Sequence, residues 1–371
     1  MKKFVFFILC LEGAILSFNV SAVSALVPSI SKDLSVPLFI TAKIIWLYML
    51  PYGVFALFYG PLIRIFEAKY IELICIILFS FSNLLAGLAK NIQALFLARF
   101  FAGVFGASVI PLALILISKG VDNKNRGKFI GLFFSVSFAS SLLGLFLSGI
   151  IYWRFIFLIP AFFGFVLSIF MYLYLPKFFT KSSIGINYFD IFKNKSIFFL
   201  FLYIFFISMF YHAIQNWLSV YFTVKFGFRQ FLISTLITLT SLSGIFGEFI
   251  GGIFSDKFGK VPTINLGIFL MILSIFLLIF KSPFWVLIII MIMWGAGWTF
   301  NHAGVSTLIT TLPEKFLNES ASLNSSIRFI SGGLGVSLGG LLMERSFTFG
   351  FLFIGLGLLC LLFLTNMLIK I

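Results

Sequence analysis

Ionisable side chains are rare inside the long apolar stretches of this sequence, and they are the first candidates for chemistry. Of 371 residues, 61% are hydrophobic and only 10% are charged. A charged group inside a membrane costs at least ~2.5–3.5 kcal/mol unless it faces protein or water, so each one is a candidate for a functional role. The candidates within the apolar stretches are Glu12, Arg99, Glu248, Arg328, His212 and His302.

Polar residues also recur at helical spacing in particular stretches. The clearest series is Ser208, His212, Gln215, Asn216 and Ser219, whose spacing places all five on one face of a helix. A single Ser or Thr in a membrane helix usually serves packing, whereas alignment on several helices indicates a path for a polar solute. The residues expected to line this path are Asn19, His212, Gln215, Asn216, Trp217, Trp294, Trp298, Asn301, His302, Asn324 and Arg328.

The candidates for proton coupling are Glu12, Arg99, Glu248 and His212. Glu12, Glu248 and Arg328 each lie roughly six to eight residues from one end of their stretch, about 9–12 Å deep, so we expect them to share one layer. Because no basic residue lies at that depth in the first half of the chain, Glu12 is the expected proton carrier. Arg99 is expected level with Asn19.

Helices long enough to cross a membrane must position these side chains. A mean hydropathy of +1.17 leaves too little polar surface for a soluble domain, and runs of about 20 apolar residues cross the hydrocarbon core as helices. Their continuous apolarity excludes the alternating pattern of a β-barrel. We predict an all-α membrane protein with twelve spans: 4–26, 39–60, 70–89, 92–117, 128–152, 154–176, 196–222, 229–254, 261–280, 283–311, 320–344 and 346–370.

The spans divide into two halves. Residues 1–176 and 196–371 each hold six of them, and residues 177–195, rich in Ser, Gly, Asn and charge, form a predicted cytoplasmic linker. The stretch "GPLIRIFEAK" (60–69) looks like an altered copy of "GGIFSDKFGK" (251–260), because aligning Gly60 with Gly252 also aligns Phe66 with Phe258 at an offset of 192 residues. That offset is about half the chain, which indicates an internal duplication.

The net charge of +15 is distributed as expected for a membrane protein rather than for a nucleic-acid-binding one. If both termini are cytoplasmic, most Lys and Arg fall in cytoplasmic loops, as the positive-inside rule requires. Two dense clusters on that side favour contact with anionic lipid head groups: Lys119, Lys124, Arg126 and Lys128, and Lys177, Lys181, Lys193 and Lys195.

The first apolar stretch begins like a secretory signal, but Glu12 and Asn19 interrupt its core. We therefore expect it to be the first helix of the bundle. The three cysteines form neither a disulfide nor a metal-binding pattern, so no metal and no cofactor is expected. The predicted location is a bacterial cytoplasmic (inner) membrane.

The stretch "GGIFSDKFGK" resembles the loop signature of the major facilitator superfamily, which lies between the second and third helices of a half. "ALFLARFFAGVFGA" (94–107), "SALVP" (24–28) and "WRFIF" (153–157) extend the resemblance over nearly the whole chain. It implies two pseudo-symmetric six-helix bundles and is strongest for the 12-helix drug:proton antiporter branch. It also implies a cytoplasmic gate formed by Gly252, Asp256, Lys257, Gly259, Lys260 and Arg64, and links Arg99 to proton movement.

Within this gate, Gly252 is expected to let two helices approach closely and Gly259 to permit a tight turn. Asp256 is expected to lie against the positive N-terminal end of the fifth span. The first copy departs from the signature, since Arg64 replaces the acid and Glu67 the turn glycine. We expect Arg64 to pair with Glu314 or Glu319.

Ser140 and Ser141 stand where the antiporter branch carries a Gly-Pro pair, which leaves the direction of transport open, and Gly144 is retained. The resemblance implies that the third, sixth, ninth and twelfth spans lie outside, and we expect them to be almost bare of buried polar groups.

These features predict a transporter rather than an enzyme. The leading expectation is proton-coupled efflux of a small amphipathic compound by rocking of two halves, with the proton as coupling ion and sodium not excluded. The alternative is proton-coupled uptake of an organic anion or another metabolite, with Arg99 and Arg328 as anion partners. A membrane-embedded transferase is a remote alternative, because neither His has an acid at helical spacing. The expected partners are the solute, the proton and the lipid bilayer, and the protein is expected to be a monomer.

Overall fold

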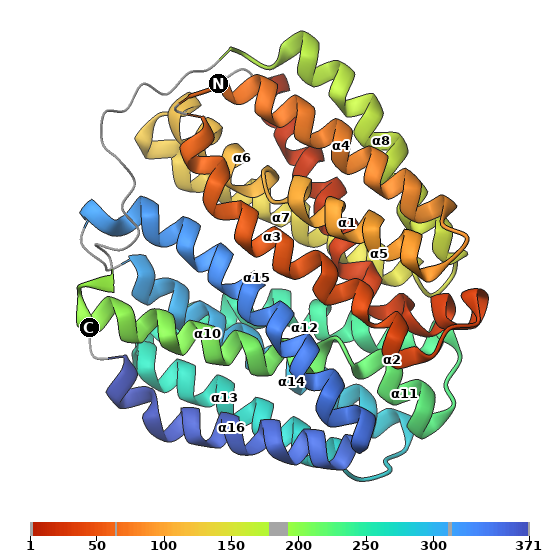
Figure 1. Cartoon of the computed structure of the whole chain (residues 1–371). Helices are drawn as coiled ribbons and strands as arrows, with labels where there is room; N and C mark the ends of the chain where they lie inside the picture. Colours follow the sequence, from red (N-terminus) through yellow and green to blue (C-terminus); the bar gives the residue numbers. More distant parts are fainter. Residues whose placement is uncertain (1–2, 64, 178–191, 311–313, 370–371) are drawn as a thin grey trace. The chain divides into compact units, whose positions relative to one another are not determined.

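The structure, a computed structural model, describes residues 3–63, 65–177, 192–310 and 314–369, apart from the side chains of 118, 119, 123, 124, 127, 310 and 314–322. The chain separates into two compact units, Met1–Ile186 and Asn187–Ile371. In the first unit the helices are α1 (Lys3–Leu34), α2 (Leu38–Thr41), α3 (Lys43–Leu62), α4 (Ala68–Leu88), α5 (Ile92–Gly106), α6 (Val109–Gly120), α7 (Asn123–Leu147) and α8 (Trp153–Tyr174). In the second they are α10 (Lys195–Gln215), α11 (Leu218–Phe226), α12 (Gln230–Phe258), α13 (Lys260–Leu278), α14 (Phe284–Thr310), α15 (Glu314–Arg345) and α16 (Phe347–Leu368) (Figure 1).

The prediction of an all-helical chain with twelve spans is confirmed: the described residues contain 12 helices, or consecutive helix pairs, long and apolar enough to cross a membrane. Several bounds differ from the predicted ones. The first helix ends at Leu34 rather than at 26, because the helix continues through Pro28. The predicted spans 92–117 and 196–222 each break into two helices, at Ala107 and Ser108 and at Asn216 and Trp217.

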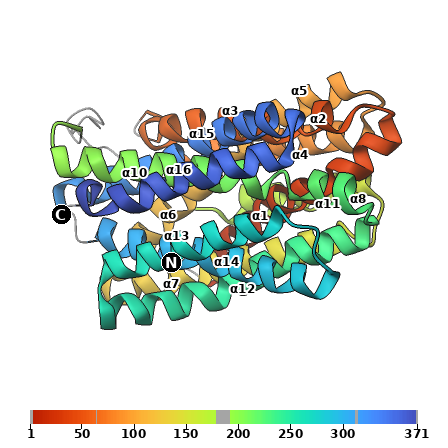
Figure 2. The ribbon, with the colours of Figure 1, turned by 90° about the horizontal axis from the view of Figure 1, so that it is seen from below.

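The same pairs of corresponding helices are in contact in both units. In the first unit the main pairs are α1 with α7, α4 with α8, α3 with α5, α4 with α5, and α1 with α8. The second unit repeats these five pairs span for span as α10 with α15, α13 with α16, α12 with α14, α13 with α14, and α10 with α16. Figure 2 shows the last of these pairs, α10 beside α16. The repeated pairing supports the duplication inferred from the loops.

Close approaches of glycine to backbone carbonyl repeat at the same offset. A Cβ atom at Gly103 of α5 would collide with the carbonyl oxygen of Tyr48 on α3, and 192 residues further one at Gly295 would collide with that of Thr240. Likewise Gly144 of α7 lies against the carbonyl of Phe18, and 191 residues on, Gly335 lies against that of Met209. Only glycine permits such close contact between helices, so these positions allow the paired helices of each bundle to pack closely.

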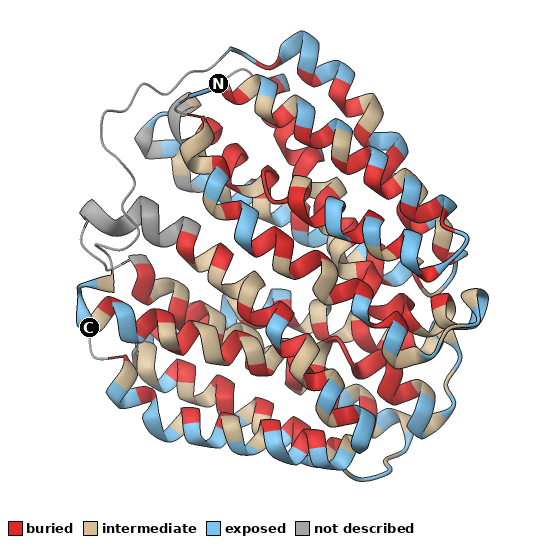
Figure 3. Cartoon of the chain, viewed as in Figure 1, coloured by how far each residue is buried: buried red, intermediate tan, exposed pale blue. Residues whose placement is uncertain are grey.

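The exposed surface of each unit is largely apolar and rich in phenylalanine. Large exposed side chains include Phe155, Phe162, Phe163 and Ile169 on α8 and Phe353, Leu356 and Phe363 on α16, and Figure 3 shows exposed residues along both helices. Such surface suits contact with acyl chains. The expectation that the third span is nearly bare of buried polar groups is wrong, because α4 buries Glu72, Ser80, Ser82 and Asn83.

The segment between α12 and α13 is reduced to a single residue, Gly259, which adopts φ +98°. A left-handed backbone of this kind strongly favours glycine, so the predicted role of Gly259 in a tight turn is confirmed. The predicted role of Gly252 in close helix approach is wrong, since a Cβ there would meet no atom within 4 Å. Its neighbour Gly251 has that role, because a Cβ at Gly251 would lie 3.2 Å from Cβ of Ala303.

Candidate functional site

Four helices of the second unit bring together a cluster of polar and aromatic side chains, which we call the α10–α15 cluster. It consists of Tyr211, His212, Gln215, Glu248, Trp294, Trp298, His302, Asn324 and Arg328. At its centre, the indole Nε1 of Trp294 donates a hydrogen bond to Oε1 of Gln215 at 2.8 Å. The amide Nε2 of Gln215 in turn donates to Oγ1 of Thr240 on α12 at 3.2 Å. Gln215 therefore ties α10 to both α12 and α14.

Glu248 and His302 form an ion-pair candidate between α12 and α14. Nδ1 of His302 lies 2.9 Å from Oε1 of Glu248. The glycines beside Glu248 make this possible: a Cβ at Gly247 would lie 3.3 Å from Cα of Ala296, so α12 and α14 run unusually close. The side chains of His302 and Glu248 keep 31% and 39% of their surface exposed.

Arg328 of α15 is only partly satisfied within the cluster. Its Nε donates to Oδ1 of Asn324 at 2.9 Å, one turn earlier on the same helix. Its guanidinium carbon lies 5.5 Å from the ring centre of Trp298, within cation–π range. Its Nη1 and Nη2 atoms are buried and have no hydrogen-bond partner among the described residues. These two donors form the fork that binds a carboxylate or phosphate in bidentate fashion.

Aromatic rings form an apolar wall beside these polar groups. The ring of Tyr211 stacks on Trp298 at a centroid distance of 3.9 Å and on Trp294 at 5.4 Å, nearly parallel in both cases. Sequence reasoning missed Tyr211, because one tyrosine carries no signal in a chain with 55 phenylalanines. The one indication in the sequence was that Tyr211 immediately precedes His212, which lies on the polar face of α10.

Three further residues predicted to line the path, Asn216, Trp217 and Asn301, are buried in the second unit. Nδ2 of Asn216 lies 3.2 Å from Nδ1 of His212, one turn earlier on α10. Trp217 is buried and its Nε1 donates to the carbonyl of Val336 on α15 at 2.9 Å. Asn301 is fully buried and donates to the hydroxyl of Tyr203. Trp217 and Asn301 thus bind neighbouring helices of their own unit.

The α10–α15 cluster is not repeated in the first unit. At the offsets of 191 and 192 residues that relate the two units, Ser21 corresponds to His212 and Ala56 to Glu248. Gly106 corresponds to Trp298, Ile110 to His302 and Ser137 to Arg328. Because the first unit keeps the same helix pairs without these groups, packing does not require them. This favours a functional role.

The first unit holds Arg99 in a buried site of its own. Its Nη1 donates to Oδ1 of Asn19 at 2.8 Å and its Nε to the carbonyl of Ile44 at 3.3 Å. The guanidinium also stacks 4.3 Å from the ring centre of Tyr48. The structure therefore joins two predicted residues, Arg99 and Asn19, and adds Ile44 and Tyr48. Arg99 is 2% exposed, so it links α1, α3 and α5 rather than facing open solvent.

Glu12 is fully buried, and its carboxyl faces that of Glu72 on α4. Sequence reasoning missed Glu72, since a residue so near the start of a span reads as an interfacial charge. The predicted proton carrier thus has an acidic partner, not a basic one.

The predicted gate residues lie at the end of α12 and the start of α13. Asp256 and Lys257 are exposed on the last turn of α12, and Nζ of Lys257 lies 5.3 Å from the ring centre of Phe258. Gly252 and Lys260 are partly exposed. Arg64 and the side chains of Glu314 and Glu319 lie outside the described residues, so their predicted pairing stays a prediction.

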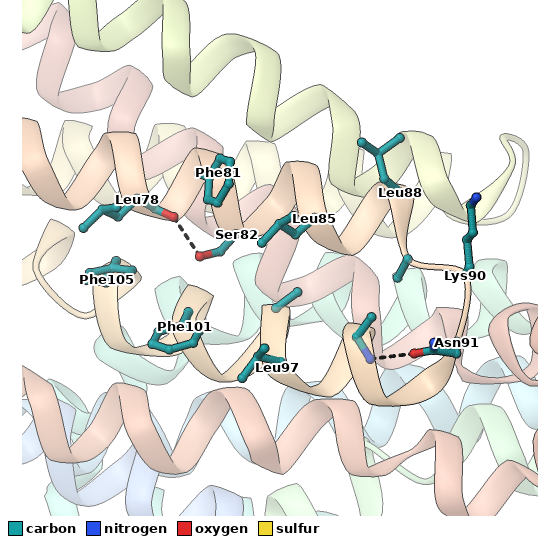
Figure 4. Close-up of a pocket in the computed structure, with 13 residues that line it drawn as sticks. Leu78, Phe81, Ser82, Leu85, Leu88, Lys90, Asn91, Leu97, Phe101 and Phe105 are labelled. Atoms are coloured by element: carbon teal, nitrogen blue, oxygen red, sulfur yellow. Dashed lines mark hydrogen bonds between the residues drawn. The ribbon is translucent and has the colours of Figure 1, made fainter.

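A cavity of about 620 Å³ between α4 and α5 lies apart from these residues. Figure 4 shows Phe81, Leu85, Leu97, Phe101 and Phe105 around it, with Lys90 and Asn91 at one end. Its one hydroxyl, that of Ser82, donates to the carbonyl of Leu78 at 2.7 Å. Apart from Lys90 and Asn91 at that end, the lining is largely apolar, as suits an acyl chain.

Comparison with known proteins gives a consistent result along the chain. The family model of the Major Facilitator Superfamily matches residues 9–340 and, in a second match, 233–370. The uncharacterized MFS-type transporter YbcL of Bacillus subtilis is 23% identical over 345 residues, which cover 90% of this chain and 88% of that protein.

Two further similarities bear on function and fold. The efflux pump hmp6 of Hypomyces subiculosus is 28% identical over 162 residues, 42% of this chain and 28% of the pump's length. The chain thus matches less than a third of that pump. The solved structure of a D-xylose-proton symporter superposes with a TM-score of 0.77 at 13% identity, covering 97% of this chain and 96% of the symporter.

Proposed function

The chain belongs to the major facilitator superfamily, and from that premise we propose that it exports a small amphipathic solute by alternating access, coupled to protons. It is a multi-pass membrane protein with 12 candidate spans and transports a small solute. The observation that carries the finer proposal is the α10–α15 cluster, which combines an aromatic wall with an acid–histidine pair in one unit. Similarity to an efflux pump supports export.

In this proposal the rings of Tyr211 and Trp298, both partly exposed, form the apolar contact for the solute, and the fully buried Trp294 supports Tyr211 by stacking against it. Stacked aromatic rings bind flat apolar groups with little loss of conformational entropy. Gln215 cannot reorient freely, because both ends of its amide are bonded to Trp294 and Thr240. It therefore fixes the indole of Trp294, on which Tyr211 stacks.

Glu248 and His302 are the proposed coupling groups of the second unit. Their carboxyl and imidazole groups lie within hydrogen-bond distance, at 2.9 Å, and both side chains remain partly exposed. Arg328 interacts electrostatically with Glu248, so gain or loss of a proton at the Glu248–His302 pair changes how strongly Arg328 attracts an anion. His212, bonded to Asn216, is a further proposed proton-coupling group.

We further propose that Asp256, Lys257, Gly259 and Lys260 form a cytoplasmic gate and that both termini are cytoplasmic. The lysines around this turn fit the positive-inside rule. The turn at Gly259 supports this, since it fixes Asp256 and Lys257 at a helix end where they remain exposed. Replacing Asp256 with Asn is expected to weaken closure on the cytoplasmic side while leaving folding largely intact.

A second candidate function is proton-coupled uptake of an organic anion. The unpartnered Nη1 and Nη2 atoms of Arg328 favour it, because a buried guanidinium without an acceptor is stabilised by a bound carboxylate or phosphate. Ser140 and Ser141 also fit it: they donate to the carbonyls of Ala14 and Ser17 at 2.8 and 3.3 Å and tie α7 to α1 where antiporters carry Gly-Pro.

Transport into proteoliposomes under imposed pH and sodium gradients distinguishes these proposals. Amphipathic cations, neutral aromatic compounds and organic anions are tested in parallel. Export predicts that amphipathic compounds accumulate when the lumen is acidic, with protons leaving as solute enters. Anion uptake predicts that solute and protons move in the same direction, and that Arg328→Gln abolishes the movement of the anion.

A further inference from the structure

Two fully buried carboxyl groups face each other in the first unit, one on α1 and one on α4. Glu12 and Glu72 are both 0% exposed, and their carboxyls interact directly. All four carboxyl oxygens lack a hydrogen-bond partner in the part of the chain that the structure describes. A carboxylate that accepts no hydrogen bond in an apolar interior is strongly disfavoured.

The two helices that carry the pair begin on the same side of the membrane, because α1 and α4 are the first and third spans. Glu12 lies nine residues after Lys3 and Glu72 four residues after Ala68. At about 1.5 Å per residue both carboxyls are within roughly 6–14 Å of that side. The pair is therefore inside the bundle but near one aqueous phase.

The neighbouring hydroxyl groups donate elsewhere. Cys75, one turn beyond Glu72, is close to both Tyr59 of α3 and Ser108 at the start of α6. The hydroxyl of Tyr59 donates to the carbonyl of Val104 at 2.8 Å. That of Ser108 donates to the carbonyl of Phe105 at 2.9 Å. Neither proton is left for the carboxyls.

The helices packed on α1 and α4 place no described cation against the pair. Arg99 of α5 is bonded to Asn19, about two turns along α1 from Glu12. Arg154 of α8 pairs with Asp33 at 3.3 Å. On α7, Lys128 is exposed, whereas the residues against Gly13 are Phe133 and Ser137, and the hydroxyl of Ser137 donates to its own helix. The other charged residue described on α7 is Arg126, near the start of that helix.

A single proton held between the two carboxyls would remove the cost of burying them side by side. It removes one of two adjacent like charges and supplies the donor that the four oxygens lack, as a short charge-assisted hydrogen bond. We propose that Glu12 and Glu72 together form a proton-binding site in the first unit, in which one proton bridges the two carboxyls.

The pair is not part of the helix packing common to both units. At the offsets that relate the units, Tyr203 corresponds to Glu12 and Ile264 to Glu72. The second unit keeps the same helix pairs with these residues, so the bundle does not need acids there. The site rests on the proposed function and deepens it: Glu72 completes the proton carrier for which Glu12 alone is insufficient.

The test is an infrared titration of the purified full-length protein in lipid, which needs no transported solute. The absorption band of protonated carboxyl groups is followed against pH in the wild type, Glu12→Gln, Glu72→Gln and the double variant. The wild type should show a buried protonated carboxyl at neutral pH that disappears at alkaline pH. Each single variant should change the pH at which it is lost, and the double variant should lack it.

Glu344→Gln, which alters an exposed carboxyl of the second unit, is the matched control and should leave the buried band unchanged. Gln can donate to the remaining Glu as the protonated acid does, so the single variants should fold. A double variant with the same band as the wild type would overturn the site, as would loss of the band on adding sodium at constant pH. If the wild type transports no solute, the proposed function is refuted, but the titration still tests the proton-binding site.

Discussion

Nδ1 of His302 lies 2.9 Å from Oε1 of Glu248, which joins α14 to α12 within the second unit. If this pair couples proton movement to transport, removal of either partner removes the same function. Glu248→Gln and His302→Gln are therefore expected to abolish gradient-driven accumulation, and the double variant should be no worse than either single one. Solute exchange without a gradient should persist, since exchange needs no net proton transfer.

Proteoliposome assays with and without a pH gradient measure these two activities separately. Thr235→Val is the matched control, because Thr235 lies partly exposed on the same helix as Glu248 and its hydroxyl donates to the carbonyl of Phe231 on that helix. Additive losses in the double variant would mean that the two side chains act independently.

Arg99 binds Asn19 where a carboxylate would be the stronger partner. Asn19 Oδ1 accepts from Arg99, while its Nδ2 is buried without a partner among the described residues. Asn19→Asp replaces that unsatisfied donor with a second acceptor and is expected to raise the midpoint of thermal unfolding in detergent. Asn19→Leu leaves Nη1 of Arg99 without its acceptor, at a cost of about 1–3 kcal/mol. An Asp variant less stable than the Leu variant would contradict the geometry around Arg99.

The glycines that repeat between the units are expected to be intolerant of any side chain. Gly144→Ala and Gly335→Ala place a methyl group against the carbonyls of Phe18 and Met209, and overpacking of this kind costs about 1–3 kcal/mol. Gly252→Ala meets open space on a helix and should be neutral or slightly stabilising. Membrane yield and thermal unfolding of the three variants measure this, and equal losses at all three positions would argue against the contacts.

Trp298 is expected to carry part of the binding energy for an aromatic solute. Trp298→Ala removes a ring on which the solute is proposed to stack. An aromatic pair is worth about 0.5–1.5 kcal/mol, so the affinity should fall roughly twofold to tenfold. Trp298→Phe keeps an aromatic ring at this position and should retain most of the affinity for the solute. Trp285 on the same helix is 65% exposed, so Trp285→Phe is the control and should leave the Kd from fluorescence quenching unchanged.

Apolar length predicted the twelve spans well, because the bilayer imposes it on every helix. It did not place the breaks at Ser108 and Trp217. Gly106 and Pro111 flank the first break, but no glycine or proline stands beside the second. Nor could apolar length show that α1 continues through Pro28. These details depend on neighbouring helices, and sequence periodicity contains no information on which helix lies opposite.

The polar residues were found by type, but their partners were not. Spacing along α10 brought out His212 and Gln215, yet the bonds of Gln215 to Thr240 and Trp294 come from two other helices. Glu72 was missed because its position near a helix end resembles an interfacial charge, and only the packing of α4 shows that it is buried. The choice between Gly251 and Gly252 also required the position of α14.

The central claim is that solute movement is tied to proton movement through the Glu248–His302 pair. The most direct measurement is the change in luminal pH of proteoliposomes, reported by an enclosed dye, when a transported solute is added without an imposed gradient. The account predicts a solute-dependent pH change in the wild type that is absent in Glu248→Gln. Solute flux of normal size with no pH change in the wild type, or an unaltered pH change in Glu248→Gln, would contradict it.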